Sequence, residues 1–283
     1  DIAGRPRTKT TCFRVYLQTL DKDGLCCNRN KSVCYCLAKM TTSLLISHKI
    51  AQALAQVQQR IALAAEQAGR PAHSVRLLAV SKTQGADAVA EAAAAGQIAF
   101  GENYVQEAVA KITALHAQIS TQMPIHLEWH CIGPVQSRKT ALVAAHFDWL
   151  QSLDRLDIAQ RLSRQRPPER APLQVCLQVN MDGGANKSGV APHAALELAR
   201  AVADLPGLQL RGLMSIPELY ADESDTLAVH QRTRALFDEM GQALQLPLWD
   251  TLSMGMSHDL EAAVRAGSTM VRVGTAIFGA RPA

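Results

Sequence analysis

The segment from Val75 to Gly96 decides the fold. It reads Val75-Arg-Leu-Leu-Ala-Val80, then a short polar turn, then the alanine-rich run Ala86–Ala95, and it ends at Gly96. The first run is too short for a helix and is rich enough in Val and Leu for a buried strand. The second run has the residues of a helix, and a glycine directly after it is typical of a helix C-terminus. The segment therefore predicts one strand–turn–helix unit.

The same unit recurs to the end of the sequence. Strand-like runs begin near Val75, Ile98, His126, Asp148, Leu173, Leu208, Leu248 and Thr269. Repeated strand–helix units with short connections favour a parallel sheet with right-handed crossovers. Eight such units favour closure into a (β/α)8 barrel. An open doubly wound sheet is the alternative, but no G-x-G-x-x-G motif follows the first strand.

The first 39 residues differ from the rest of the sequence in charge and cysteine content. They hold eight Lys and Arg against three Asp and Glu, and five of the seven cysteines. Cys26-Cys27 and Cys34-x-Cys36 lack the paired spacing of common zinc modules, so we expect no metal site. We interpret residues 1–39 as an extension, disordered or a non-native start, and residues 40–283 as the barrel. From Met40 onward, an amphipathic helix is expected to lead up to the first strand.

Composition excludes several classes of function. Residues 40–283 hold 21 basic against 22 acidic side chains, which leaves no basic surface for a nucleic acid. No run approaches the roughly 18 consecutive apolar residues of a membrane span. Cys131 and Cys176 are isolated thiols, as is typical of a reducing compartment. We therefore expect a cytoplasmic globular protein that binds neither a membrane nor a nucleic acid.

Candidate site residues follow the strands, because (β/α)8 barrels carry their active sites at the C-terminal ends of the strands. Lys82 follows the first strand, where a packed lysine can condense with a carbonyl as a Schiff base. Arg272, Gly274 and Thr275 fall at the end of the eighth strand. Ser257 follows the seventh strand and is expected to be an N-cap whose hydroxyl also faces a phosphate. The loops after these two strands form the usual phosphate site of such barrels.

An amine beside a phosphate pocket suits two chemistries. Pyridoxal 5′-phosphate (PLP) requires this arrangement, and a Schiff-base aldolase for a phosphosugar requires much the same. Spacing in the sequence does not separate them.

Four further residues carry polar or basic side chains near the expected mouth or interior of the barrel. Asn103, after the second strand, is expected to line the site and also to cap the next helix. His126 and His130 alternate with Trp129 on the third strand, which predicts packed or hydrogen-bonded histidines rather than a metal site. Lys187, after the fifth strand, is a second amine, and we expect it to pair with a carboxylate.

Seven motifs resemble the YggS/PROSC family of pyridoxal phosphate homeostasis proteins. They are Leu78-Ala-Val-Ser-Lys-Thr83, Phe100-Gly-Glu-Asn-Tyr-Val-Gln-Glu107, Trp129-His-Cys-Ile-Gly-Pro134, Lys187-Ser-Gly189, Arg211-Gly-Leu-Met214, Leu252-Ser-Met-Gly-Met-Ser257, and Gly267 through Arg281. They occur in the family's order and spacing from about Met40 onward.

The resemblance implies a single-domain barrel similar to the N-terminal domain of alanine racemase, with PLP held as an internal aldimine on Lys82. It implies phosphate contacts from Ser257, Gly274 and Thr275, and Arg272 facing the pyridine nitrogen. A cation there disfavours protonation of the ring nitrogen and weakens the cofactor as an electron sink. Alanine-racemase-like enzymes also have a second domain that supplies a tyrosine base, and none is expected here, so we expect a monomer.

The function expected from the resemblance is PLP binding in vitamin B6 and amino-acid homeostasis, without efficient catalysis. Amino acids or PLP-dependent apoenzymes are then the expected partners. The alternative is a weak PLP-dependent amino-acid racemase, with Tyr104, His130 or Cys131 as the base. A phosphosugar aldolase is a third and remote hypothesis.

Overall fold

The computed structural model describes residues 31–119, 126–183, 188–218, 220 and 222–279. The chain divides into two units, residues 1–48 and residues 49–283. Helix α2 (Lys31–Gln67) runs from the first unit into the second, and the rest of this description concerns the second unit. The predicted boundary at Met40 stays a prediction, and residues 1–30 of the predicted extension lie outside the described residues.

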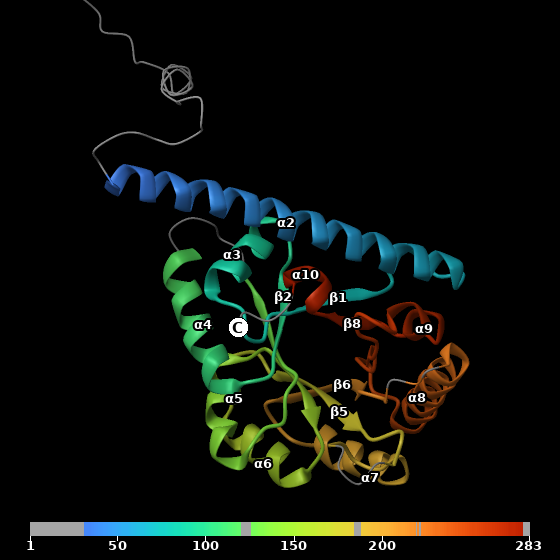
Figure 1. The fold of residues 1–283 in the computed structure, drawn as a ribbon. Coiled ribbons are helices and arrows are strands. Elements are labelled where there is room, and N and C mark those ends of the chain that lie inside the picture. The colour runs from blue at the N-terminus through green and yellow to red at the C-terminus, as the bar shows by residue number, and fades with distance from the viewer. Residues whose placement is uncertain (1–30, 120–125, 184–187, 219, 221, 280–283) are drawn as a thin grey trace, which may run out of the picture. The chain divides into compact units, whose positions relative to one another are not determined.

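The second unit is a closed barrel of eight parallel strands in sequence order, which confirms the predicted (β/α)8 barrel. Figure 1 shows the helices arranged around the strands. The strands are β1 (Arg76–Val80), β2 (Ala99–Glu102), β3 (Glu128–Cys131), β4 (Trp149–Leu153), β5 (Leu173–Val179), β6 (Leu208–Ser215), β7 (Thr251–Ser253) and β8 (Met270–Val273). The helices that follow them are α3 (Ala86–Ala94), α4 (Val105–Ile119), η1 (Ser137–Lys139) with α5 (Thr140–His146), α6 (Leu156–Gln165), α7 (Pro192–Ala203), α8 (Glu223–Leu244), α9 (Leu260–Arg265) and α10 (Thr275–Phe278).

Alternation along the strands separates two apolar regions. Side chains such as Phe100, Trp129 and Leu150 belong to the large cluster that includes the buried faces of the helices. Two smaller clusters contain residues at the alternate positions in and directly after the strands. One holds Leu78, Val80, Ala99, Ile132 and Met270, and the other holds Trp149, Cys176 and Met214. Because neighbouring residues of a strand point to opposite faces, the smaller clusters occupy the inside of the barrel.

The amphipathic helix predicted before the first strand is confirmed. Ile50, Leu54, Val57 and Ile61 are buried, at the spacing of one helix face. The helix ends at Gln67, and Gly69 adopts a positive φ of 69° just beyond it. This half of α2 thus packs its apolar face into the core of the barrel unit.

Two strands begin later than predicted. β3 starts at Glu128, so His126 precedes the strand and is exposed, and the prediction that it shares a strand face with His130 is wrong. β7 starts at Thr251 rather than near Leu248. Trp249 instead stacks on Phe237 of α8 and donates its ring N–H to the Phe237 carbonyl, which holds this segment out of the sheet.

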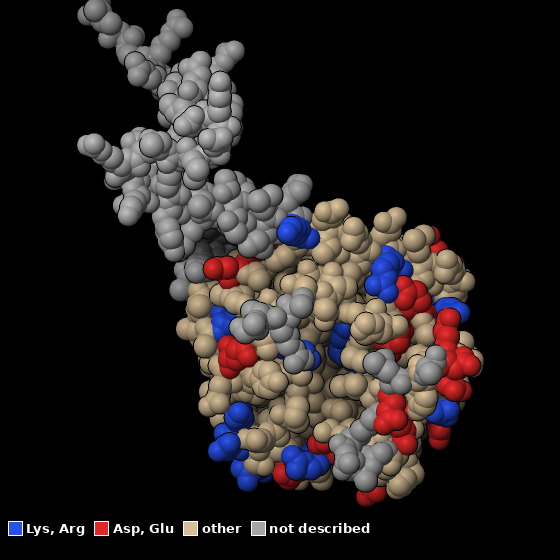
Figure 2. All heavy atoms as spheres, in the orientation of Figure 1, with Lys and Arg blue, Asp and Glu red and all other residues tan. Residues whose placement is uncertain are grey.

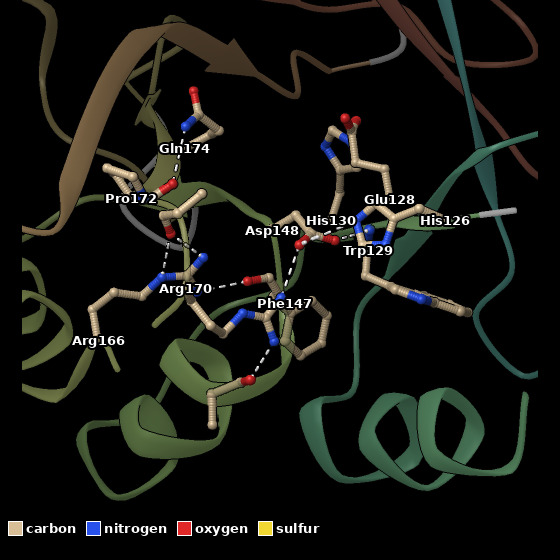
Figure 3. Close-up of polar contacts among 12 residues, drawn as sticks. His126, Glu128, Trp129, His130, Phe147, Asp148, Arg166, Arg170, Pro172 and Gln174 are labelled. Carbon is tan, nitrogen blue, oxygen red and sulfur yellow. Dashed lines mark hydrogen bonds and ion pairs between the residues drawn. The ribbon is translucent and has the colours of Figure 1, made fainter. Parts of the chain in front are cut away.

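Charged side chains tie the N-terminal end of the barrel together. The Asp148 carboxylate accepts the Trp129 backbone N–H at 2.9 Å and an Arg170 N–H at 2.9 Å (Figure 3). Beside it, Glu128 accepts an Arg76 N–H at 2.9 Å and contacts His130 Nε2 at 2.5 Å. These contacts link β1, β3, β4 and the loop before β5 at the end opposite to the expected site.

Glu128 predicts an acid-sensitive contribution to stability. Burial alone would raise the pKa of its carboxyl, but the hydrogen bond from His130 and the charge of Arg76 lower this pKa to about 2. A depressed folded-state pKa stabilises the protein above the unfolded value and loses that stabilisation as pH falls toward 2. We expect Glu128→Gln to lower the free energy of unfolding by about 2 to 3 kcal/mol at pH 6, and the difference from wild type to shrink below pH 4. Urea unfolding across pH measures this, with Glu197→Gln on the exposed side of α7 as the control; a difference that does not change with pH would contradict it.

Candidate functional site

A cavity of about 230 Å³ opens at the C-terminal end of the strands. It is lined by all six residues that the sequence singled out: Lys82, Asn103, Ser257, Arg272, Gly274 and Thr275. Thr83, Ile132, Ile216 and Met256 add to its wall. Figure 2 shows a hollow near the centre of this face, surrounded mostly by uncharged surface, with acidic side chains gathered to one side over α8 and α9. The structure thus brings the predicted residues together; that they contact a cofactor stays a prediction.

Lys82 lies in a tight turn directly after β1. The Gln84 N–H donates to the Ser81 carbonyl at 3.0 Å, and Thr83 adopts a left-handed φ of 65°, which is uncommon for a β-branched residue. The Thr83 N–H donates to Glu107 Oε1 of α4 at 2.9 Å, which helps to hold this conformation. The lysine therefore lies in a short turn that is held by a hydrogen bond within the turn and by another to α4.

A buried cation anchors that turn from outside the barrel. The ammonium of Lys111 on α4 donates to the Ser81 carbonyl at 2.9 Å and to Glu102 Oε1 at 2.6 Å. Ser81 Oγ also donates to Glu102 Oε1 at 2.6 Å. Both charged side chains are almost fully buried, with exposed fractions of 5% for Lys111 and 0% for Glu102. Burial raises the pKa of the Glu102 carboxyl, and the positive charge of Lys111 opposes that rise.

Asn103 follows β2 and faces the cavity from the side next to the Lys82 turn. Its neighbour Gly133 allows this placement, since a Cβ atom there would lie 2.2 Å from the Asn103 carbonyl oxygen. Asn103 Oδ1 is buried and has no hydrogen-bond partner among the described residues, and the same holds for Thr83 Oγ1. This oxygen therefore does not cap the next helix as predicted, and it has no partner among the described residues that would compete with a polar ligand atom.

Arg272 of β8 forms part of the floor of the cavity. Its side chain is buried, with donors to Ser253 Oγ at 2.8 Å and to the Ser215 carbonyl at 2.7 Å. Burial lowers the pKa of its guanidinium to about 10, so the group remains cationic at neutral pH. A fixed positive charge thus lies at the inner side of the cavity.

The prediction that Ser257 is an N-cap is wrong, as the loop after β7 shows. Ser257 does not cap a helix, because α9 begins at Leu260 with Asp259 at the N-cap position. The Asp259 carboxylate accepts the Met256 N–H at 2.6 Å and contacts His230 Nε2 at 3.0 Å, and this closes a turn over residues 256–259. Ser257 lies within that turn, on the cavity wall.

After β8 the chain enters the short helix α10, which starts at Thr275. A Cβ atom on Gly274 would lie 3.0 Å from the Val80 carbonyl oxygen, so a side chain here would crowd β1 and the cavity floor. The first backbone N–H groups of a helix lack partners within it and suit an anion. Loops after the seventh and eighth strands together with a short helix are the usual phosphate site of such barrels.

The three residues considered as a base lie away from the lining of the cavity that the described residues form. Cys131 is fully buried, donates to the Gly133 carbonyl, and burial raises its thiol pKa to about 12. His130 is buried inside the barrel and hydrogen-bonded, as predicted. Tyr104 is exposed beyond the wall. Lys187 lies outside the described residues.

Sequence reasoning missed the residues that hold these side chains in place. Lys111 lies within the helical run after β2, where a lysine ordinarily faces solvent, and nothing local marks it as buried.

Within the described part of the chain, His, Cys, Asp and Glu side chains form no group of three that could hold a metal ion. Nor does any described helix have the length and apolar character needed to cross a membrane.

The cavity fits PLP in its donor set. The lysine supplies an amine for the aldehyde, the lining residues Asn103 and Thr83 each have a buried oxygen without a hydrogen-bond partner among the described residues, and the loops after β7 and β8 offer polar groups for a phosphate. Gly274 has no side chain to crowd Val80, and this keeps its part of the cavity wall clear.

Comparison with known proteins decides the family. The model of the alanine racemase N-terminal domain matches residues 53–282. A pyridoxal phosphate homeostasis protein of Pasteurella multocida is 52% identical over 232 residues, which are 82% of this chain and 97% of the relative. The chain belongs to this family. A pyridoxal phosphate homeostasis protein of Pseudomonas aeruginosa is 54% identical over 232 residues, which are 82% of this chain and 96% of that protein.

Solved structures agree with this assignment. PipY of Synechococcus elongatus with PLP bound is 38% identical and superposes with a TM-score of 0.69, covering 81% of this chain and 100% of that one. Alanine racemase of E. faecalis is 16% identical, with a TM-score of 0.58 over 85% of this chain and 59% of that one, which shows the shared barrel fold alone. The predicted resemblance is confirmed.

The buried Lys111–Glu102 pair predicts a large stability effect. Lys111→Met leaves the Glu102 carboxylate buried without its cation, so we expect a loss of about 3 to 5 kcal/mol in the free energy of unfolding. Adding Glu102→Gln removes the stranded charge and is expected to restore part of that loss. Urea unfolding measures both, and Lys49→Met on the exposed side of α2 is the control. Equal stability of Lys111→Met and Lys49→Met would contradict the assignment.

Proposed function

We propose that this chain binds PLP in the cavity and holds it through a Schiff base on Lys82. The observation that carries the proposal is the meeting of Lys82 with the loops after β7 and β8 around one cavity. The amine condenses with the aldehyde of the cofactor, forming a C=N bond and releasing one water. The names of the curated relatives and the PLP-bound PipY structure support this assignment.

Ser257, Gly274 and Thr275 bind the phosphate in this proposal. They lie on the loops where such barrels bind phosphate, and Thr275 opens the short helix α10. Asn103 contacts the ring from the β2 side through its unpartnered oxygen. These three loops therefore fix the cofactor at both ends, with Lys82 between them.

Arg272 determines what the bound cofactor can do. PLP supplies an electron sink when its ring nitrogen is protonated. With the guanidinium of Arg272 facing that nitrogen, protonation is disfavoured and carbanion chemistry is damped. We therefore propose that the chain binds and releases PLP in vitamin B6 and amino-acid homeostasis, in the cytoplasm, without efficient turnover. Amino acids and PLP-dependent apoenzymes are the proposed partners.

A weak amino-acid racemase is the alternative that the test must separate. Racemisation needs groups beside the cavity that remove and return a proton at the α-carbon. Exchange of the α-hydrogen of added amino acids in deuterium oxide measures this. Exchange at enzyme-like rates that Lys82→Ala abolishes would replace the proposed role with the racemase.

The anchor itself is tested by spectroscopy and trapping. We expect a visible absorption band when PLP is added, and reduction with borohydride to fix the cofactor onto the peptide that contains Lys82. Lys82→Ala is expected to lose the band and the trapped adduct, since the described residues that line the cavity include no other lysine. Lys139→Ala, which removes a lysine after β3, is the matched control.

Either of two results would contradict the proposal. A band and adduct that persist in Lys82→Ala would move the anchor to another residue. A wild-type protein that shows neither after incubation with PLP would reject the cofactor itself.

A further inference from the structure

Five polar side chains form a column inside the barrel below the cavity. They are Arg272 of β8, Ser253 of β7, Gln151 of β4, and His130 and Glu128 of β3, and we call them the polar column. The first four have exposed fractions of 4% or less. Unpaired polar groups at such depth are costly, so each member must find a hydrogen-bond partner.

Every neighbouring pair in the polar column is in hydrogen-bond contact. Arg272 Nη1 donates to Ser253 Oγ at 2.8 Å, and Ser253 Oγ donates to Gln151 Oε1 at 2.7 Å. Gln151 Nε2 lies 2.8 Å from His130 Nδ1, and His130 Nε2 lies 2.5 Å from Glu128 Oε1. The column therefore runs without a break from the cavity floor to the opposite end of the barrel, where Figure 3 shows its last two members.

The donor and acceptor atoms in these contacts give every bond a direction. Arg272 can only donate, so Ser253 Oγ accepts from it and has its own hydrogen left for the Gln151 carbonyl oxygen. This turns the Gln151 amide nitrogen toward His130, which must then accept at Nδ1 and donate from Nε2 to the Glu128 carboxylate. Burial lowers the pKa of His130, in keeping with a neutral ring that carries one hydrogen.

Two contacts hold the middle of the polar column. The other hydrogen of the Gln151 amide points to the Met270 sulfur at 3.1 Å. The His130 ring stacks on Trp149, with ring centroids 5.0 Å apart and an angle of 12° between the planes. Neither Gln151 nor His130 has freedom to turn toward another partner without leaving a buried polar atom unpaired.

We propose that Gln151 and His130 are positioning residues for Arg272, because they orient Ser253 so that it accepts from the guanidinium at the cavity floor. The Ser253 hydroxyl has one hydrogen, and Gln151 commits that hydrogen away from the cavity. Without the Gln151 acceptor, the hydrogen of the Ser253 hydroxyl has no fixed partner and can turn toward Arg272, which can only donate, so the contact between the two side chains weakens. The column thus fixes one of the two acceptors that hold the guanidinium, the other being the Ser215 carbonyl.

The effect of this positioning on PLP rests on the proposed function, but the first test of the positioning needs no cofactor. Phenylglyoxal modifies accessible arginine side chains, and peptide mass spectrometry gives the rate at Arg272. We expect Ser253→Ala, which removes the acceptor of the Arg272 guanidinium, to raise that rate at least about tenfold, as loss of one hydrogen bond to a charged group implies. Gln151→Met removes the neutral bond that orients this acceptor, so we expect a smaller rise of about fivefold, and we expect Ser253→Thr to keep the wild-type rate.

Gln97→Met is the matched control. Gln97 is buried like Gln151, but its amide donates to two backbone carbonyls, those of Leu77 and Ala99, and not to a member of the polar column. We expect its rate at Arg272 to equal that of wild type. A Gln151→Met rate that stays at the wild-type level, or that Gln97→Met matches, would overturn the proposal.

A measurement on the unmodified protein covers the case in which these variants fail to fold. Nitrogen-15 NMR distinguishes the tautomers of a neutral histidine from each other and from the doubly protonated ring. The proposal requires His130 to be neutral and to carry its hydrogen on Nε2 at pH 7. Finding the hydrogen on Nδ1, or on both nitrogens, would overturn it.

A final comparison connects the polar column to PLP and separates the two proposals. If Arg272 is displaced in Gln151→Met, the cofactor band should titrate at a pH about one unit higher than in wild type, while borohydride still traps the adduct on Lys82. Loss of the adduct from wild type as well would reject the proposed function and leave the phenylglyoxal result to decide the column. A retained adduct with an unshifted titration would overturn the positioning role.

Discussion

Closure of the barrel by pairing β1 with β8 is the constraint on which the site depends. The two strands pair in parallel with Leu78 opposite Arg272, although these residues are far apart in the sequence. Because parallel strands of a barrel end at one rim, the residue after β1 and the residues after β8 meet there. In an open sheet, Lys82 and Gly274 would lie at opposite edges and form no common cavity.

Two networks of buried polar residues hold the side chains at that rim in place. One network lies on each side of the sheet. Outside the barrel, Lys111 binds Glu102 and the Ser81 carbonyl and so fixes the turn that carries Lys82. Inside the barrel, the polar column holds Arg272. A buried hydrogen-bonded group has few alternative partners, so such contacts select one arrangement of the site rather than many. Rigidity at the cavity floor is what a site that holds a cofactor in one orientation requires.

Local pattern predicted the elements better than their ends. The strand-like runs and the helix before the first strand are all present, since period and composition report burial directly. The ends depend on contacts that the local sequence does not contain. Trp249 leaves the sheet for α8, and His230 helps Asp259 close a turn, so β7 starts late and Ser257 is not an N-cap.

The sequence by itself determined the repeated unit, the barrel and the six residues around the cavity, because strand ends of a (β/α)8 barrel share one face. It also carried the family motifs that the comparisons confirm. Only the tertiary structure decided which buried groups support them. Alternation shows that Gln151 and His130 share a side of the sheet, but their partners come from other strands, and the directions of their bonds follow from those partners. The placement of Lys111 likewise depends on how α4 packs against β1 and β2, which no local pattern encodes.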